Sequence, residues 1–297
     1  MIYTVTLNPS LDYTAKSHGF SVGKTNRTTD EYIVPGGKGL NVSIMLKRMG
    51  IDSTAYGFSA GFTGEKLKSL MSEFGVNCEF TDIGTGFTRI NLKLVSDEVT
   101  EFNGSGITVN SESLDILKEK ISKIRSGWLV LSGSIPNGCD SNIYKDIMSV
   151  TDKSVKIVLD TSGDALKKAL SEKPFLVKPN IDELSEFFST DIPLSMVEIF
   201  AEKLQSLGAR NVIVSLGGQG SAMLTENGEY IRIPPPDGVM VNTVGAGDSL
   251  VAGFIAKFDE TEDFRESLKY AVASGSATAY SKWLSEKELI DKLYNTL

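Results

Sequence analysis

The segment from Asn242 to Gly253 carries the clearest chemistry in this sequence. Gly245 and Gly247 flank Ala246, Asp248 follows at once, and the apolar run after it predicts a helix. The first amides of a helix are unpaired and attract anions, and glycine lets a phosphate come close to the backbone. An acid beside such an anion site is useful if it handles a proton. The segment therefore predicts phosphoryl transfer with Asp248 as the base.

The same residues also allow a purely structural interpretation. Aspartate is common at helix starts, where its carboxylate accepts hydrogen bonds from free backbone amides. The motif alone does not decide between a cap and a base, so other parts of the chain must.

A second glycine-rich segment directly follows an apolar strand. Ser215-Leu-Gly217-Gly218-Gln-Gly220 comes straight after Val212–Val214. Its glycines would allow close backbone approach to a phosphate or a ribose. Glycine-rich hairpin turns have the same composition, so this cradle remains one of two interpretations.

Two further motifs place lysine and asparagine near helix starts. Pro35-Gly36-Gly37-Lys38-Gly-Leu-Asn41 spaces Lys38 and Asn41 so that both side chains could face one ligand. Lys178-Pro-Asn180 closes a strand, and Glu183 follows with the spacing of a helix-capping pair. Capping explains Asn180 and Glu183 on its own, while a phosphate or metal role for them needs more than spacing.

Common nucleotide fingerprints are absent. Gly23-Lys24-Thr25 has His18 where a Walker A loop needs glycine, and no Gly-x-Gly-x-x-Gly follows a strand. The protein-kinase signature is missing as well. Any nucleotide chemistry must therefore use another cradle.

Strands and helices alternate along most of the 297 residues. This alternation predicts one α/β unit over residues 1–297 with a largely parallel sheet, helices on both faces, and a site at the strand carboxyl ends. The predicted strands are Tyr3–Leu7, Leu129–Leu131, Lys156–Leu159, Phe175–Val177 and Val212–Ser215. The predicted helices are Val42–Met49, Gly64–Glu73, Ser113–Ile124, Asn142–Val150, Glu183–Phe188, Ser195–Leu207 and Phe264–Ser281.

Two segments, 13–35 and 87–104, break this alternation with β-prone residues and a hairpin pattern. We expect them to leave the main sheet and form a small β-sheet lid over the site. A plain antiparallel extension of the main sheet is the other possibility.

Composition limits the partners. The net charge of −8 argues against nucleic acid or an anionic membrane, so an anionic substrate must meet local lysine and arginine. Cys78 and Cys139 are too few for a disulfide framework, which favours reduced thiols and a cytoplasmic location. His18, the one histidine, is expected in solvent rather than in catalysis.

These motifs, in this order, resemble the PfkB (ribokinase-like) carbohydrate kinases over essentially the whole chain. The match rests on Gly36-Gly37, on Lys178-Pro-Asn180 with Glu183, and on Asn242-Thr-Val-Gly-Ala-Gly-Asp248-Ser. Within the family, Leu7-Asn-Pro-Ser-Leu-Asp12 and Pro35-Gly-Gly-Lys-Gly-Leu-Asn41 look like the phosphofructokinase branch, and Thr88-Arg-Ile-Asn91 also resembles a bacterial member of that branch. The resemblance implies a ribokinase-like fold, ATP and Mg²⁺ as cofactors, and a homodimer formed through the lid.

The resemblance also implies roles for individual residues. Asp248 is the implied base, and the amides from Gly245 through Ala246 and Gly247 to Asp248 are the implied anion hole for the γ-phosphate. The implied ligands of the sugar hydroxyls are Asp12, Gly36, Gly37 and Asn41. The implied ligands of the phosphate already on the substrate are Lys38, Arg89 and Arg27. The nucleotide side comprises Lys178, Asn180, Ser215, Gly217, Gly218, Gly220, Gly247 and Ser274, and Glu183 is expected to hold Mg²⁺ through water.

For substrate, the resemblance implies transfer from ATP to the 6-hydroxyl of fructose 1-phosphate. Transfer to the 1-hydroxyl of tagatose 6-phosphate is the nearest alternative. A sugar-phosphate-binding regulator without catalysis is a third, although a pure binding protein has no use for a base at Asp248.

Overall fold

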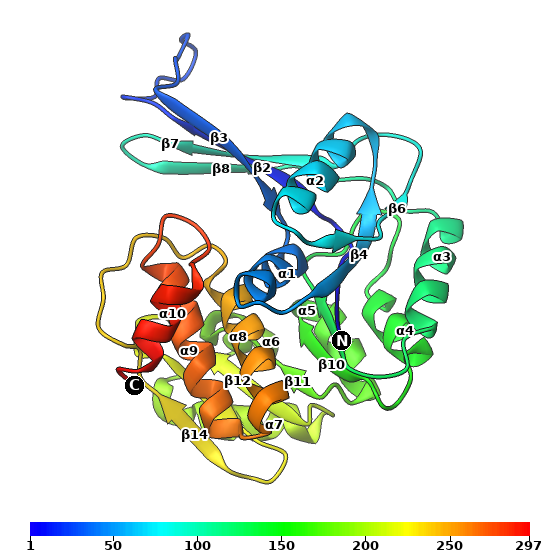
Figure 1. The fold of residues 1–297 in the computed structure, drawn as a ribbon, viewed down its shortest axis with the longest axis vertical. Helices are drawn as coiled ribbons and strands as arrows, with labels where there is room; N and C mark the ends of the chain where they lie inside the picture. Colours follow the sequence, from blue (N-terminus) through cyan, green and yellow to red (C-terminus); the bar gives the residue numbers. More distant parts are fainter.

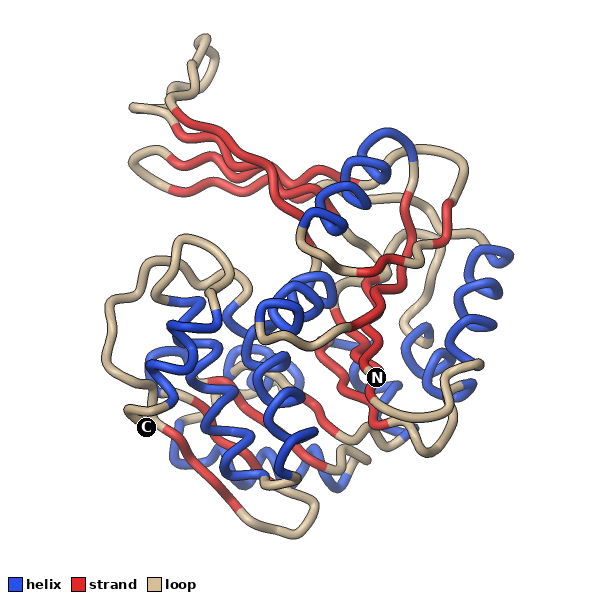
Figure 2. Tube along the Cα trace, in the orientation of Figure 1, coloured by secondary structure: helices blue, strands red, loops and turns tan.

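The computed structural model describes all residues from Met1 to Leu297 and consists of a large sheet between two layers of helices, with a smaller sheet projecting from it (Figure 1). The small sheet stands clear of the main body (Figure 2). No helix is both long and apolar enough to span a bilayer.

The main sheet is ten-stranded and largely parallel. Its order is β14-β13-β12-β11-β10-β9-β1-β4-β5, and β6 pairs with β4. Only the β12–β13 and β13–β14 pairs are antiparallel. The strands are β1 (Ile2–Thr6), β4 (Ser53–Ser59), β5 (Asn77–Cys78), β6 (Thr81–Asp82), β9 (Trp128–Ser132), β10 (Lys156–Asp160), β11 (Leu176–Val177), β12 (Asn211–Ser215), β13 (Ser221–Leu224) and β14 (Tyr230–Ile233).

Two apolar cores hold the helices against the two faces of this sheet. Every residue of β9 is buried, as expected for a parallel strand covered on both sides. One core includes residues of α1 (Lys38–Arg48), α2 (Gly61–Glu73), α8 (Ala246–Thr261), α9 (Phe264–Ala279) and α10 (Lys287–Tyr294). The other includes residues of α3 (Ser111–Ser122), α4 (Ile143–Val150), α5 (Gly163–Ala169), α6 (Ile181–Phe188) and α7 (Val197–Ser206).

The predicted strands and helices are all present, with ends shifted by a few residues. The sequence reading missed β4, α5, α10 and the β13–β14 hairpin. β4 reads Ser-Thr-Ala-Tyr-Gly-Phe-Ser, which lacks a continuous apolar run, yet it lies beside β1 and is mostly buried. Its strand character comes from pairing with β1 rather than from its own composition.

The smaller sheet, which we call the lid sheet, comprises β3 (Asp30–Gly36), β2 (Ser10–Lys16), β7 (Arg89–Val95) and β8 (Val99–Asn103), in that order. It is separate from the main sheet, so the prediction of a β-sheet lid is confirmed and the antiparallel extension is wrong. β2 pairs with β7 in parallel and with β3 in antiparallel fashion. Residues 17–29, including the exposed His18, connect β2 to β3.

Candidate active site

A cleft of about 1240 Å³ runs along the carboxyl ends of the parallel strands and under the lid sheet. Asp160 ends β10, Lys178 follows β11, and Ser215 ends β12. Asp12 of the lid sheet and the first turn of α8 complete the lining. The cleft therefore lies where open parallel sheets place their ligands.

The first turn of α8 leaves the amides of Gly245, Gly247 and Asp248 without a hydrogen-bond partner, whereas the Ala246 amide donates to the carbonyl of Thr243 at 3.4 Å. Gly245 is the N-cap residue in the left-handed conformation, with φ 80°, and no side chain caps the helix. A left-handed residue at this point favours glycine because a Cβ would be strained there. The free amides and the helix dipole together favour a negatively charged group in front of Gly245.

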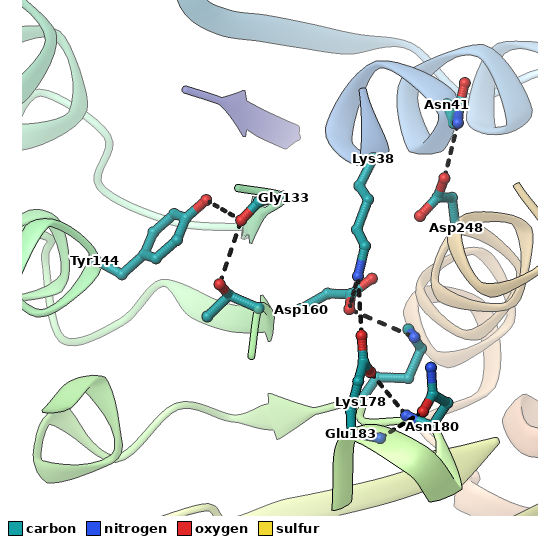
Figure 3. Close-up of polar contacts among 10 residues, drawn as sticks. Lys38, Asn41, Gly133, Tyr144, Asp160, Lys178, Asn180, Glu183 and Asp248 are labelled. Atoms are coloured by element: carbon teal, nitrogen blue, oxygen red, sulfur yellow. Dashed lines mark hydrogen bonds and ion pairs between the residues drawn. The ribbon is translucent and has the colours of Figure 1, made fainter. Parts of the chain in front are cut away.

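Asp248 is not the cap of this helix. Its side chain is 6% exposed, and its Oδ2 accepts a hydrogen bond of 2.8 Å from Nδ2 of Asn41 (Figure 3). Burial, followed by the negative charge of Asp160, raises the pKa of Asp248 to about 6. The capping interpretation is therefore wrong, and the raised pKa is of the kind often found for carboxylates in functional sites.

Asp160 binds two lysines close to Asp248. Its Oδ1 lies 2.9 Å from Nζ of Lys38 and 3.4 Å from Nζ of Lys178. Burial alone would raise the pKa of Asp160, but Lys178 and Lys38 outweigh it and hold the pKa below its usual value. The pKa of Lys38 is raised because the attraction of Asp160 and Glu183 exceeds the effect of burial. Both lysines thus carry positive charge into the cleft.

Lys38, to which the resemblance assigns the phosphate already on the substrate, forms ion pairs with acidic residues of the cleft. Its ammonium points past Asn41 toward Asp160 and lies 3.6 Å from Oε1 of Glu183 (Figure 3). It therefore shares its surroundings with Lys178, on the side of the residues predicted to bind the triphosphate.

Asn180 and Glu183 form a complete capping box at the start of α6. The Asn180 side chain accepts from the Glu183 amide at 2.7 Å, and Glu183 Oε2 accepts from the Asn180 amide at 2.9 Å. The structural interpretation is thus correct for both residues. Oε1 of Glu183 remains directed at Lys38, and both residues line the cleft.

The residues that fit a Mg²⁺ ion are few. Oδ2 of Asp160 is buried without a hydrogen-bond partner, and Oε1 of Glu183 lies near the same lysine. No group of three or more His, Cys, Asp or Glu side chains is arranged to hold a metal. A magnesium ion here would take most of its oxygen ligands from phosphate and water, as it commonly does in nucleotide sites.

The lid sheet contributes a polar face to the cleft. Oδ1 of Asp12 accepts hydrogen bonds from Ser10 at 2.7 Å and from Asn91 at 2.9 Å. Arg89 donates from Nη1 to the carbonyl of Gly104 at 3.3 Å, while its Nε is buried without a partner. Arg89 therefore keeps donors for an anionic ligand, which suits its predicted role.

Three predicted residues do not line the cleft. Arg27 is exposed in the connector between β2 and β3, outside the cleft. Gly36 acts indirectly, because a Cβ there would lie 2.2 Å from Oδ1 of Asp12. Ser274 is fully buried and donates to the carbonyl of Tyr270, so it is a packing residue; its neighbours Gly275 and Ser276 line the cleft instead.

The glycine cradle after β12 lies at the end of the cleft away from the lid. Ser215, Gly217, Gly218 and Gly220 all line it. No atom lies within 4 Å of the positions that a Cβ would take at Gly217 and Gly218. That open surface allows a ligand to rest directly on the backbone.

Sequence reasoning missed several lining residues, above all Asp160. An acid directly after the apolar strand Lys156–Leu159 was the available signal, because strand carboxyl ends carry functional side chains. Asn8, Asn91 and Ser134 also line the cleft. Asn8 and Asn91 lie within segments that resemble the family but were not predicted as site residues, and Ser134 lies in no such segment.

Comparison with known proteins agrees with this geometry. The family model described as pfkB family carbohydrate kinase matches residues 6–287. The chain belongs to this family. It is therefore an enzyme of the carbohydrate kinase class, and its predicted ribokinase-like fold is confirmed.

Two curated relatives and one solved structure illustrate the similarity. A 1-phosphofructokinase of Bacillus subtilis is 42% identical over 296 residues, covering 99% of this chain and 97% of the relative. A D-tagatose-1-phosphate kinase of Bacillus licheniformis is 34% identical, covering 98% and 97%. The tetrameric inhibited form of phosphofructokinase-2 from Escherichia coli matches with a TM-score of 0.92 and 32% identity, covering 99% and 98%. The three similar proteins are thus all named as kinases that act on sugar phosphates.

Proposed function

We propose that this kinase transfers the γ-phosphoryl group of ATP to the 6-hydroxyl of D-fructose 1-phosphate. The observation that carries the proposal is the buried Asp248 beside the uncapped start of α8. That pairing puts a base and an anion site next to each other between the lid sheet and the glycine cradle. The 42% identity to a protein named 1-phosphofructokinase supports the choice of sugar.

In this mechanism Asn41 holds one oxygen of Asp248, which leaves the other free to accept the proton of the sugar hydroxyl. The proton moves as the new O–P bond forms, and the O–P bond to ADP breaks on the opposite side of the phosphorus. Phosphoryl transfer asks the protein mainly for position and charge. The amides from Gly245 to Asp248 supply the donors for the phosphoryl oxygens.

Lys38 and Lys178 supply positive charge to the phosphates, and Asp160 fixes the two ammonium groups in place. Lys178 is 4% exposed, so its charge acts in a poorly hydrated environment where it is stronger than in water. When bound with ATP, Mg²⁺ neutralises charge on the phosphate oxygens. Asp160 and Glu183 are the acidic residues that would hold its water shell.

On the sugar side, we assign Asp12 and Asn41 to hydroxyl groups, and Arg89 to the phosphate that the substrate already carries. Asn41 Oδ1 is buried without a partner, which suits it to accept a hydrogen bond from a sugar hydroxyl. An arginine fork matches phosphate oxygens bidentately.

We also propose a homodimer formed through the lid sheet. One face of that sheet carries Asp12 and Asn91, which are paired in register. The opposite face carries Ile33, Ile90 and Phe102, which are 41%, 41% and 57% exposed. A second copy would cover that apolar face, and the relative from Escherichia coli is described as a tetramer. The cytoplasm is the location that this composition favours.

The decisive test is kcat/KM for fructose 1-phosphate, fructose 6-phosphate, tagatose 1-phosphate and tagatose 6-phosphate with ATP. We expect fructose 1-phosphate to rank first. A preference for either 6-phosphate would overturn the choice of hydroxyl, and a preference for tagatose 1-phosphate would overturn only the choice of sugar. Absence of turnover with all four would favour the non-catalytic alternative.

A further inference from the structure

A chain of buried hydroxyl groups lies behind the first turn of α8. Ser249 Oγ donates to the carbonyl of Gly245 at 2.8 Å and lies 2.7 Å from Oγ1 of Thr278 on α9. The amide of Ser285, in the loop after α9, donates to the same Thr278 oxygen at 3.2 Å. Each hydroxyl has one proton, so with Ser249 donating to Gly245, Thr278 donates to Ser249. All these bonds then run in one direction, from Ser285 to Gly245.

The far end of this chain is anchored by Arg48, the last residue of α1. Its Nη1 donates to the carbonyls of Leu284 and, at 3.1 Å, of Ser285. Its guanidinium lies over the Trp283 ring, 5.2 Å from the ring centre, and its Nη2 is 3.1 Å from Glu286. The loop that carries Ser285 is therefore fixed to α1.

The same loop touches the anion hole directly. A Cβ at Gly245 would lie 2.6 Å from Cδ2 of Leu284, so that side chain packs against the left-handed residue. Leu284 is 5% exposed, and Ser249, Thr278 and Ser285 are at most 1% exposed. Both an apolar contact and a hydrogen-bond chain thus join the loop to Gly245.

The need for such support follows from the geometry of the turn. An ordinary helix start is held by a side chain that bonds its free amides, but α8 has no such cap because those amides must stay open to phosphate. The turn can still be fixed through its carbonyl, from the side away from the ligand. A fully bonded buried polar network favours one arrangement strongly, because breaking it would leave polar groups unpaired.

We propose that Thr278 and Arg48 are positioning residues for the anion hole. Thr278 acts through Ser249 to set the direction of the amides from Gly245 to Asp248, and Arg48 holds the loop from which the chain starts. Since α1 also carries Asn41, which binds Asp248, one helix then sets both the base and the phosphate donors. This inference rests on the proposed kinase activity.

The test compares Thr278→Val, which keeps the shape and removes the hydroxyl, with Thr278→Ser, which restores it. Thr151→Val is the matched control, because Thr151 is also buried and bonds a backbone carbonyl, Ile147 O, at 2.8 Å, but lies at the end of α4. We expect Thr278→Val to lower kcat about tenfold with the KM for the sugar phosphate within about twofold, as a displaced anion hole would. Thr278→Ser should restore most of the rate, and Thr151→Val should keep it.

Two outcomes would overturn the proposal: a kcat for Thr278→Val close to that of the unmodified protein, or an equal loss in Thr151→Val. If Thr278→Val does not fold, Ser249→Ala replaces it in the test, because it removes the next hydroxyl of the chain. We expect Ser249→Ala to lower kcat about tenfold with little change in KM, as for Thr278→Val.

Amide hydrogen exchange of the free protein gives a readout that does not depend on activity. Peptides spanning residues 243–250 should exchange faster in Thr278→Val than in Thr151→Val. An unmodified protein that turns over no sugar phosphate would refute the proposed function, whereas equal exchange in the two variants would refute the positioning role itself.

Discussion

The two sides of the cleft are built differently. On the side assigned to the transferred phosphate, the first turn of α8 runs from half-buried Gly245 to buried Asp248, and it is contacted by Asn41 of α1 and, through Ser249, by Thr278 of α9. On the sugar side, the lid sheet is thin, and every residue of β8 is exposed. From this contrast we expect the chemistry to depend on the interior, where charges and dipoles act strongly, and recognition of the sugar phosphate to depend on the lid sheet.

The largest effect is expected from the buried side. Asp248→Asn keeps the hydrogen bond from Asn41 but cannot accept the sugar proton, so kcat should fall by at least about 10². ATP binding should change little. Asp182→Asn, in the first turn of α6 at the cleft edge, is the control and should retain the rate. Near-normal turnover in Asp248→Asn would remove the base from the mechanism.

The same variant should be more stable at neutral pH. The pKa of Asp248 is raised from 3.8 to about 6, so the ionised group costs folding stability; the cost builds up between pH 3.8 and about 6 and stays constant at higher pH. Asp248→Asn should therefore raise Tm at pH 8, with the gain fading toward pH 4. Thermal unfolding at several pH values measures this, and a gain that does not depend on pH would contradict it.

The next largest effect on kcat is expected from a change in the anion hole. Gly245→Ala adds a methyl group against Leu284 in a left-handed residue, and we expect kcat to fall about tenfold or more as the amides shift. Gly228→Ala is matched to it, since Gly228 has φ 81° in a remote turn with open space around it. Equal kcat losses in the two variants would attribute the effect to backbone strain alone.

On the lid side, Arg89→Ala should act on binding rather than on chemistry. Loss of a charge-assisted bond to phosphate should raise the KM for the sugar phosphate about tenfold while the KM for ATP stays the same. Lys24→Ala, in the exposed connector, is the control. A fall in kcat without a change in KM would show that the two sides are less separate than the structure indicates.

Asp160→Asn tests how the buried cluster tunes the base. The unmodified enzyme should lose kcat/KM as the pH falls below about 6, where Asp248 becomes protonated. Removing the negative charge of Asp160 should lower the pKa of Asp248 and move this acid limb to lower pH. An acid limb that stays in place or moves upward in the pH–rate profile would contradict this coupling.

The smallest effect on chemistry is expected at the outer face of the lid sheet. Phe102→Glu places a charge on the apolar face that we assign to the second copy, so the dimer should dissociate. Sedimentation velocity measures this dissociation. Glu112→Lys, which changes an exposed charge in the first turn of α3 outside the lid sheet, is the control. A dimer that persists in Phe102→Glu would place the interface elsewhere.

Much of this molecule could be predicted from its sequence, because the relevant signals are local. The alternation of apolar strands and amphipathic helices predicted the layered sheet. The glycines around Ala246 and the polar residues after β11 and β12 predicted the glycine cradle and the anion site. Local signals of this kind depend on backbone conformation and burial, which neighbouring residues largely decide.

What the tertiary structure decided was how distant segments meet. Asp248 could have been a cap, but it makes no capping bond, accepts a hydrogen bond from Asn41 of α1, and has a pKa raised by burial and by the negative charge of Asp160. Ser274 proved to be a packing residue because it packs against Gly253 of α8. The capping box of Asn180 and Glu183, by contrast, is a local interaction that the spacing of the two residues had already indicated. A shift in pKa depends on the distances between charged side chains, and these distances are set only when the chain has folded.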